Sequence, residues 1–112
     1  MSLSTHVLDA ALGRPAAGVA VRLERPGSPD GTGRGGEVLA EGVTDADGRI
    51  AGWTCGAGEH RLVFDTGGYF AARAVKAFYP RVSIDFTVTD PAEHHHVPLL
   101  LSPFAYSTYR GS

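Results

Sequence analysis

The strongest constraint on the fold is a series of short segments in which apolar and polar side chains alternate. In residues 82–88 the order is Val-Ser-Ile-Asp-Phe-Thr-Val, and a similar alternation recurs in residues 3–8, 19–24 and 60–64. A period of two is typical of a strand with one buried face. Turn-forming residues separate the segments, and no repeated helical pattern supplies crossovers for a parallel sheet. The pattern therefore predicts a mainly antiparallel β-sandwich.

The connecting segments predict turns and loops. A reversal is predicted at Gly13-Arg14-Pro15, between the first two strands. Residues 26–36 are nearly all Gly, Pro and small polar residues, which predicts a loop. The Thr-Asp-Ala-Asp-Gly sequence of residues 44–48 predicts a tight turn that places Arg49 at the start of the next strand. Residues 31–36 do not complete a phosphate-binding motif, and residues 45–48 do not complete a calcium-binding loop.

One short helix is predicted between the strands. Asp65-Thr66 has the chemistry of a helix cap, and the following residues 67–76 place Phe70 and Ala74 on one helical stripe. Pro80 prevents the helix from continuing.

The C-terminal residues 94–112 combine three histidines, an apolar run and aromatic residues. They predict an apolar strand, a Ser-Pro turn and a second strand that runs to the last residue. Within the first of these strands, His94 and His96 share one face and His95 points to the other. We therefore expect an ordered terminus that can carry function.

Composition narrows the range of functions. The 112 residues suit one domain, 1–112, with a single core. A net charge of −2 with scattered basic residues argues against nucleic acid as a partner. No apolar run is long enough to span a membrane, and Cys55 is the only cysteine. We expect a cytoplasmic protein in which Cys55 is a packed side chain.

Two motifs carry a family resemblance. The sequence His94-His95-His96-Val-Pro-Leu-Leu-Leu-Ser-Pro and the ending Tyr-Ser-Thr-Tyr-Arg-Gly-Ser resemble those of the 5-hydroxyisourate hydrolases, the transthyretin-related enzymes of urate breakdown. Transthyretin is similar in the Leu-Leu-Ser-Pro and Tyr-Ser-Thr parts but lacks the Tyr-Arg-Gly-Ser ending. The middle histidine, His95, stands where this family often has Tyr.

The resemblance implies a fold, an assembly and a reaction. The implied fold is a transthyretin-like antiparallel β-sandwich of two four-stranded sheets with one short helix. The implied assembly is a homotetramer, a dimer of dimers with sites in a channel at the dimer–dimer interface. The implied reaction is the hydrolysis of 5-hydroxyisourate at its N1–C6 amide bond, which yields 2-oxo-4-hydroxy-4-carboxy-5-ureidoimidazoline.

The resemblance also implies the site residues. It assigns catalysis to His6, Arg49 and His96, without a metal ion or cofactor, and substrate binding to Tyr109, Arg110, Gly111 and Ser112. An imidazole, with an ordinary pKa of about 6.5, is suited to take a proton from water, and either His96 or His6 is the candidate base. A guanidinium supplies a planar set of donors for a developing oxyanion.

Other interpretations remain open at this point. His94 and His96 have the spacing of metal ligands on a strand, and His6 could complete a zinc site. A transthyretin-like carrier of small aromatic ligands shares the fold, and a purely structural sandwich is a further alternative. Without the terminal motif, Arg49 and Arg110 would be interpreted as surface charges.

Overall fold

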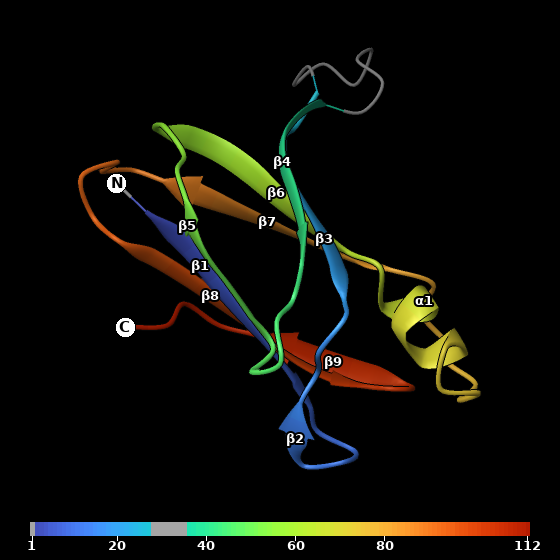
Figure 1. Cartoon of the computed structure of the whole chain (residues 1–112). Coiled ribbons are helices and arrows are strands. Elements are labelled where there is room, and N and C mark those ends of the chain that lie inside the picture. The colour runs from blue at the N-terminus through green and yellow to red at the C-terminus, as the bar shows by residue number, and fades with distance from the viewer. Residues whose placement is uncertain (1, 28–35) are drawn as a thin grey trace.

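The structure is a computed structural model that describes residues 2–27 and 36–112. Its strands form two sheets that pack face to face (Figure 1). The first sheet contains β1 (Leu3–Asp9), β2 (Arg14–Pro15), β5 (Arg49–Trp53), β8 (His95–Ser102) and β9 (Ala105–Thr108). The second sheet contains β3 (Ala20–Arg25), β4 (Glu37–Val43), β6 (Gly58–Phe64) and β7 (Val82–Val88).

β1 is the central strand of the first sheet. On one side it pairs with β8 in parallel, from Leu3 opposite His95 to Asp9 opposite Leu101. On its other side it pairs antiparallel with β5 and, further along, with the two residues of β2. β9 pairs antiparallel with β8, and every pair of the second sheet, in the order β4-β3-β6-β7, is antiparallel. The predicted sandwich is confirmed, with one parallel pair and a very short fifth strand in it.

The parallel pair was not visible in the sequence pattern because side chains alternate with a period of two in both kinds of ladder. It follows from the chain's path. Between β1 and β8 the chain builds the whole second sheet, which is the long crossover that parallel neighbours need.

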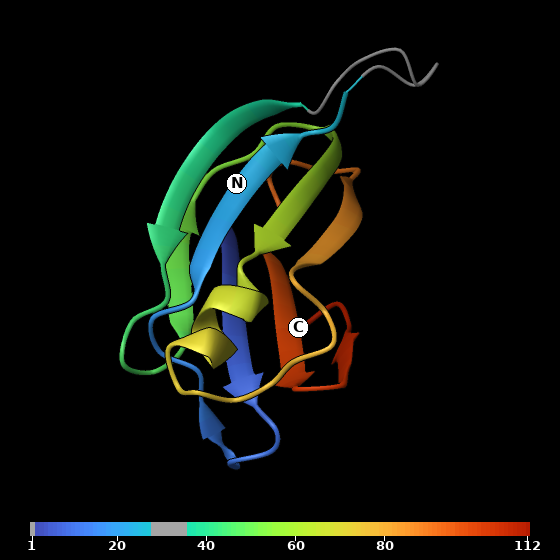
Figure 2. The ribbon, with the colours of Figure 1, turned by 90° about the vertical axis from the view of Figure 1, so that its right-hand side faces the viewer.

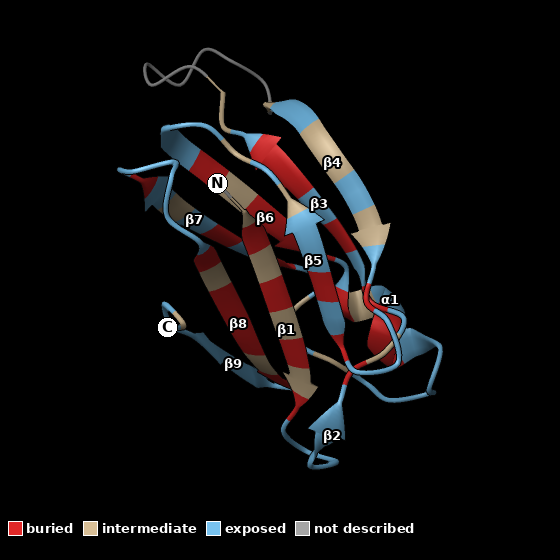
Figure 3. Cartoon of the chain, turned by 60° about the vertical axis from the view of Figure 1, so that its left-hand side comes forward, coloured by how far each residue is buried: buried red, intermediate tan, exposed pale blue. Residues whose placement is uncertain are grey.

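The core lies between the sheets. β1 alternates between buried and half-buried residues, and β8 does so except at the buried run of residues 97–99; Figure 3 shows these as bands along both strands. Val7, Leu99 and Leu101 of the first sheet meet Leu62 and Phe64 of the second. Burying side chains of this size stabilises the fold by about 1.5–3 kcal/mol each.

The helix is shorter than the sequence predicted. α1 spans Thr66–Ala71, and Figure 2 shows it directly after β6 at one end of the sandwich. Asp65 caps it as predicted and accepts a hydrogen bond from Gly68 N at 3.0 Å. The predicted continuation to residue 76 is wrong, because Ala74 has a φ of 56° and Val75 N donates back to Phe70 O at 3.0 Å. A left-handed residue followed by such a bond closes a helix.

Of two other predicted connections, one differs in the structure and the other lies mostly outside the described residues. The reversal at residues 13–15 pairs β1 with β2, whereas the next long strand, β3, belongs to the other sheet. The predicted loop of residues 26–36 falls mostly within residues 28–35, which lie outside the described part of the chain.

Candidate active site

The predicted catalytic residues come together on the outer face of the first sheet. His6 is on the half-buried face of β1, opposite Arg49 of β5. Ser4 is on the same face and lies opposite His96 of β8. Because β5, β1 and β8 are adjacent, His6, Arg49 and His96 share one surface.

A rigid turn sets the position of Arg49. Asp45 Oδ1 accepts hydrogen bonds from the backbone N–H groups of Asp47 and Arg49, both at 2.9 Å. Gly48 has a φ of +76°, and its carbonyl accepts a hydrogen bond from Val7 N at 2.7 Å. A Cβ at this glycine would collide with the carbonyl of Val7. The turn therefore requires glycine and ties the start of β5 to β1.

His96 is the best-defined side chain of the cluster. It is half-buried, and its Nδ1 is 2.7 Å from Ser4 Oγ. The ring of His94 stacks on it with a centroid separation of 6.4 Å and an interplanar angle of 18°. Burial lowers the pKa of His96, and the electrostatic influence of His94, Arg49 and His6 lowers it further. Its neutral, proton-accepting form is favoured as a result.

The opposite direction of His95 is confirmed. Its side chain is 95% buried, and its Nδ1 lies 3.1 Å from the carbonyl oxygen of Glu93. His95 therefore belongs to the interior, whereas His94 and His96 belong to the outer face.

The terminal strand ends earlier than predicted. β9 pairs with β8 from Ser102 opposite Ala105 to Leu99 opposite Thr108. In the same register Tyr109 falls opposite Pro98, which has no N–H to donate. Pairing resumes once, where Gly111 N donates to His96 O at 2.8 Å. The tail is thus held against His96 by a single bridge.

Gly111 lies directly against the His96 ring. A Cβ at this position would be 2.5 Å from His96 Cδ2. Carbon atoms without a bond between them pack at about 3.5–4.0 Å, so a side chain here would displace the ring. Gly111 therefore acts through the space that it leaves for His96.

The other predicted binding residues, Tyr109, Arg110 and Ser112, form the rest of the tail. His96, Tyr109 and Arg110 border a hollow of about 340 Å³ that extends to β7 and to buried His95. Arg110 is 3.9 Å from Glu93 in an exposed ion pair, which contributes little to stability. Ser112 is exposed.

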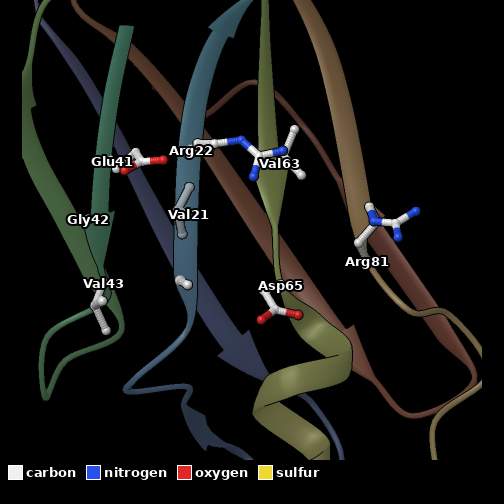
Figure 4. Close-up of a pocket in the computed structure, with 9 residues that line it drawn as sticks. Val21, Arg22, Glu41, Gly42, Val43, Val63, Asp65 and Arg81 are labelled. Carbon is white, nitrogen blue, oxygen red and sulfur yellow. The ribbon is translucent and has the colours of Figure 1, made fainter. Parts of the chain in front are cut away.

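A larger hollow, of about 510 Å³, lies on the second sheet (Figure 4). Figure 4 shows the side chains of Arg22, Glu41 and Asp65 around it. No predicted site residue borders this hollow. Its size alone does not connect it with the chemistry of the histidines and Arg49.

Three further observations concern the alternatives. In the described part of the chain, no three His, Cys, Asp or Glu side chains are arranged to hold a metal ion, so the zinc interpretation gains no ligand set there. Burial raises the pKa of the Cys55 thiol, and its side chain packs against the core. No helix in residues 2–27 and 36–112 has the length and apolar character needed to cross a membrane.

Sequence reasoning missed the supporting residues. Ser4 and Asp45 were not singled out, although Ser4 is two residues before His6 and must share its face. That spacing was the available signal for Ser4. The signal for Asp45 was the predicted turn of residues 44–48, because an aspartate at the start of a turn often accepts hydrogen bonds from backbone N–H groups further along it.

This fold and site define a class of protein: a transthyretin-like sandwich with imidazole and guanidinium groups on one sheet and a C-terminal tail held against them. The sequence matches the HIUase/Transthyretin family over residues 3–111. The chain belongs to this family.

Similar proteins agree with this assignment. A 5-hydroxyisourate hydrolase of Caulobacter vibrioides is 48% identical, over 98% of this chain and 97% of its own length. The solved 5-hydroxyisourate hydrolase of Klebsiella pneumoniae has a TM-score of 0.84 and 40% identity, with both chains covered completely. Sea bream transthyretin, solved in complex with thyroxine, also has a TM-score of 0.84, at 34% identity over 97% of this chain and 93% of its own.

Proposed function

We propose that this protein hydrolyses 5-hydroxyisourate to 2-oxo-4-hydroxy-4-carboxy-5-ureidoimidazoline by opening the ring at its N1–C6 amide bond. The observation that carries the proposal is the placement of His6, Arg49 and His96 on one face of the first sheet. The similar hydrolases from Caulobacter vibrioides and Klebsiella pneumoniae support the choice of substrate.

In this mechanism His96 is the general base. Its lowered pKa keeps the imidazole neutral near pH 7, so that it can accept a proton from the attacking water. The resulting hydroxide adds to the C6 carbonyl, and the negative charge moves to the carbonyl oxygen.

Arg49 stabilises that charge. Its guanidinium offers several N–H donors in a plane and stays protonated throughout the reaction. His6, its neighbour across the β1–β5 pair, orients the water or the ring from the same face. No metal ion or cofactor takes part in this scheme.

The tail completes the groove around the substrate. Tyr109 supplies an aromatic wall, and Arg110 and Ser112 supply donors for the polar ring. Gly111 leaves room for the His96 ring and fixes the tail to it through the backbone. Deleting residues 109–112 should therefore lower the hydrolysis rate strongly and change the melting temperature only slightly.

We further propose that four copies assemble as a dimer of dimers in the cytoplasm. Large apolar side chains are exposed near β9, namely Phe78, Phe104 and Tyr106. Exposed apolar side chains next to an open strand edge favour association with another copy. Light scattering after size exclusion should give a mass about four times that of the 11.8 kDa chain.

The decisive experiment follows the absorbance of freshly made 5-hydroxyisourate with and without the protein, before and after treatment with a chelator. We expect faster decay than the spontaneous rate in both preparations. No acceleration at micromolar protein would contradict the hydrolase. Tight binding of thyroxine without hydrolysis would favour the carrier, for which the likeness to thyroxine-bound sea bream transthyretin is the supporting observation.

A further inference from the structure

A line of hydrogen bonds leads from His96 along the outer face of the first sheet. Ser4 Oγ is 2.7 Å from His96 Nδ1 and 3.1 Å from His94 Nε2. The hydroxyl of Ser2 contacts the other ring nitrogen of His94, Nδ1. Hydroxyl and imidazole groups therefore alternate in the order Ser2, His94, Ser4 and His96.

The parallel pairing of β1 with β8 produces this order. Ser4 lies opposite His96, and a backbone bond from His95 N to Ser2 O, at 2.9 Å, extends the pairing past Leu3. Side chains two residues apart on each strand then face the same way. Ser2 and Ser4, just before and within β1, therefore meet His94 and His96, just before and within β8.

From this geometry we propose that Ser4 and His94 are positioning residues, which fix the tautomer of His96 and relay its proton to the surface. The proposal rests on the proposed function for its kinetic tests. It rests on the hydrogen-bond geometry alone for its spectroscopic test.

The single proton of the Ser4 hydroxyl gives the line two possible directions. In one direction His96 Nδ1–H donates to Ser4 Oγ, Ser4 donates to His94 Nε2, and His94 Nδ1–H donates to Ser2 Oγ. His96 Nε2 then carries a lone pair. In the other direction Nε2 carries a proton and cannot act as a base. Only the first direction prepares His96 for the attack of water.

The relay balances the proton that the base accepts. As water transfers a proton to His96 Nε2, the Nδ1 proton of His96 passes to Ser4, and the proton of Ser4 passes to His94 Nε2. The Nδ1 proton of His94 passes to Ser2, whose own proton leaves to solvent. Hydroxide forms the new bond to C6, and no group in the line remains charged. The reverse relay then lets His96 Nε2–H protonate N1 as the C6–N1 bond breaks.

The surroundings of His96 explain why such a relay is useful. His6 on β1, Arg49 on β5 and His94 before β8 all disfavour a positive charge on His96, and Arg110 of the tail, paired with Glu93, borders the hollow next to it. The groups of the tail and of β7 that border the same hollow include Tyr109 and Asp85. A base whose burial and neighbours disfavour a positive charge works better when its second proton can leave.

The first experiment is ¹⁵N NMR of histidine-labelled protein at a pH where His96 is neutral. The parent should show His96 with the proton on Nδ1. Ser4→Ala should shift it towards the Nε2–H form, and Ser4→Thr, which keeps a hydroxyl, should restore the parent signal. An Nε2–H signal in the parent, or no change in Ser4→Ala, would overturn the proposal.

The second experiment measures kcat and KM. Ser4→Ala should lower kcat about tenfold with KM little changed, less than the hundredfold or more expected for loss of the base itself. His94→Phe keeps a stacked ring but removes both ring nitrogens, and it should lower kcat by the same factor. In the double variant kcat should be no lower than in either single variant, because both changes break the same line of hydrogen bonds. Ser83→Ala, an exposed hydroxyl on β7, is the matched control and should match the parent.

The outcomes separate this proposal from the function on which it rests. Parent kcat in both single variants, or additive losses in the double variant, would overturn the relay while hydrolysis stands. A parent without hydrolysis would remove the proposed function, and the NMR signal of His96 would still decide the geometry.

Discussion

The two sheets carry charged side chains on their outer faces in opposite ways. On the second sheet, Arg22 pairs with Glu24 at 2.7 Å and Arg61 with Asp85 at 2.6 Å. On the first sheet, Arg49 lies beside His6, and no carboxylate of a described residue is within ion-pair distance of it. Charges that neutralise one another leave little to attract a ligand, whereas unpaired donors are available to one. This difference supports the first sheet, rather than the larger hollow on the second sheet, as the place of the proposed chemistry.

The largest expected effect comes from the base. His96→Asn should lower kcat by roughly a hundred- to ten-thousandfold, because general-base catalysis contributes about that much, with little change in melting temperature. His95→Tyr is the control: it points inward, next to a hollow of about 340 Å³, and should leave activity near that of the parent. The reverse result would mean that the two faces of β8 are assigned wrongly.

The comparison of the two sheets is tested directly by one arginine from each. Arg49→Gln should lower kcat by about a hundred- to thousandfold, the usual loss when an oxyanion donor is removed. Arg22→Gln removes a paired arginine from the second sheet and should leave kcat unchanged. Equal losses in both variants would show that the pairing of charges does not mark the site. Steady-state kinetics on both proteins suffices.

A smaller effect is expected at the contact between the tail and the site. Gly111→Ala should displace the His96 ring and lower kcat by up to about a hundredfold, since a misplacement of about 1 Å can cost that much. Gly56→Ala is the matched control, because a Cβ there meets no other atom within 4 Å. Parent kinetics in Gly111→Ala would mean that the ring can move without consequence.

The smallest effect is a shift in pH dependence. Because the pKa of His96 is lowered, kcat/KM should persist as the pH falls below about 6.5 and decline only at lower pH. In Arg49→Gln the inflection should move upward, since one of the charges that lower the pKa is gone. The unfolded chain binds a proton at His96 more readily than the folded chain does. The free energy of unfolding should therefore decrease as the pH falls from about 6.5 towards the lower pKa of His96 in the folded state.

The sequence was sufficient to predict which side chains share a face of a strand, but it did not show which strands pair with one another. Alternation placed His96 and His95 on opposite faces, because side-chain direction is a local property of a strand, and the structure shows that the face of His95 is the buried one. It could not reveal that β8 lies parallel to β1, and so the contacts of Ser4 were missed. The early end of β9 had a signal in Pro98, but using it required the register of a strand that lies further along the chain.

The helix shows a second limit of local reasoning. The Asp65 cap was predictable because capping depends on neighbouring residues. Where α1 ends was not, because the left-handed conformation of Ala74 is uncommon for a residue with a side chain. Resemblance to known enzymes supplied the roles of His6, Arg49 and the tail, which no pattern of alternation could assign.

The parallel pairing of β1 with β8 has a consequence for synthesis. Ser4 and His96 are 92 positions apart, so the first half of the candidate site emerges from the ribosome long before the second. Until β8 arrives, one edge of β1 has no partner, and open edges invite pairing with other chains. Contacts between such distant positions also slow folding. The nascent chain therefore lacks the face shared by β1 and β8, and with it the candidate site, until β8 has been synthesised.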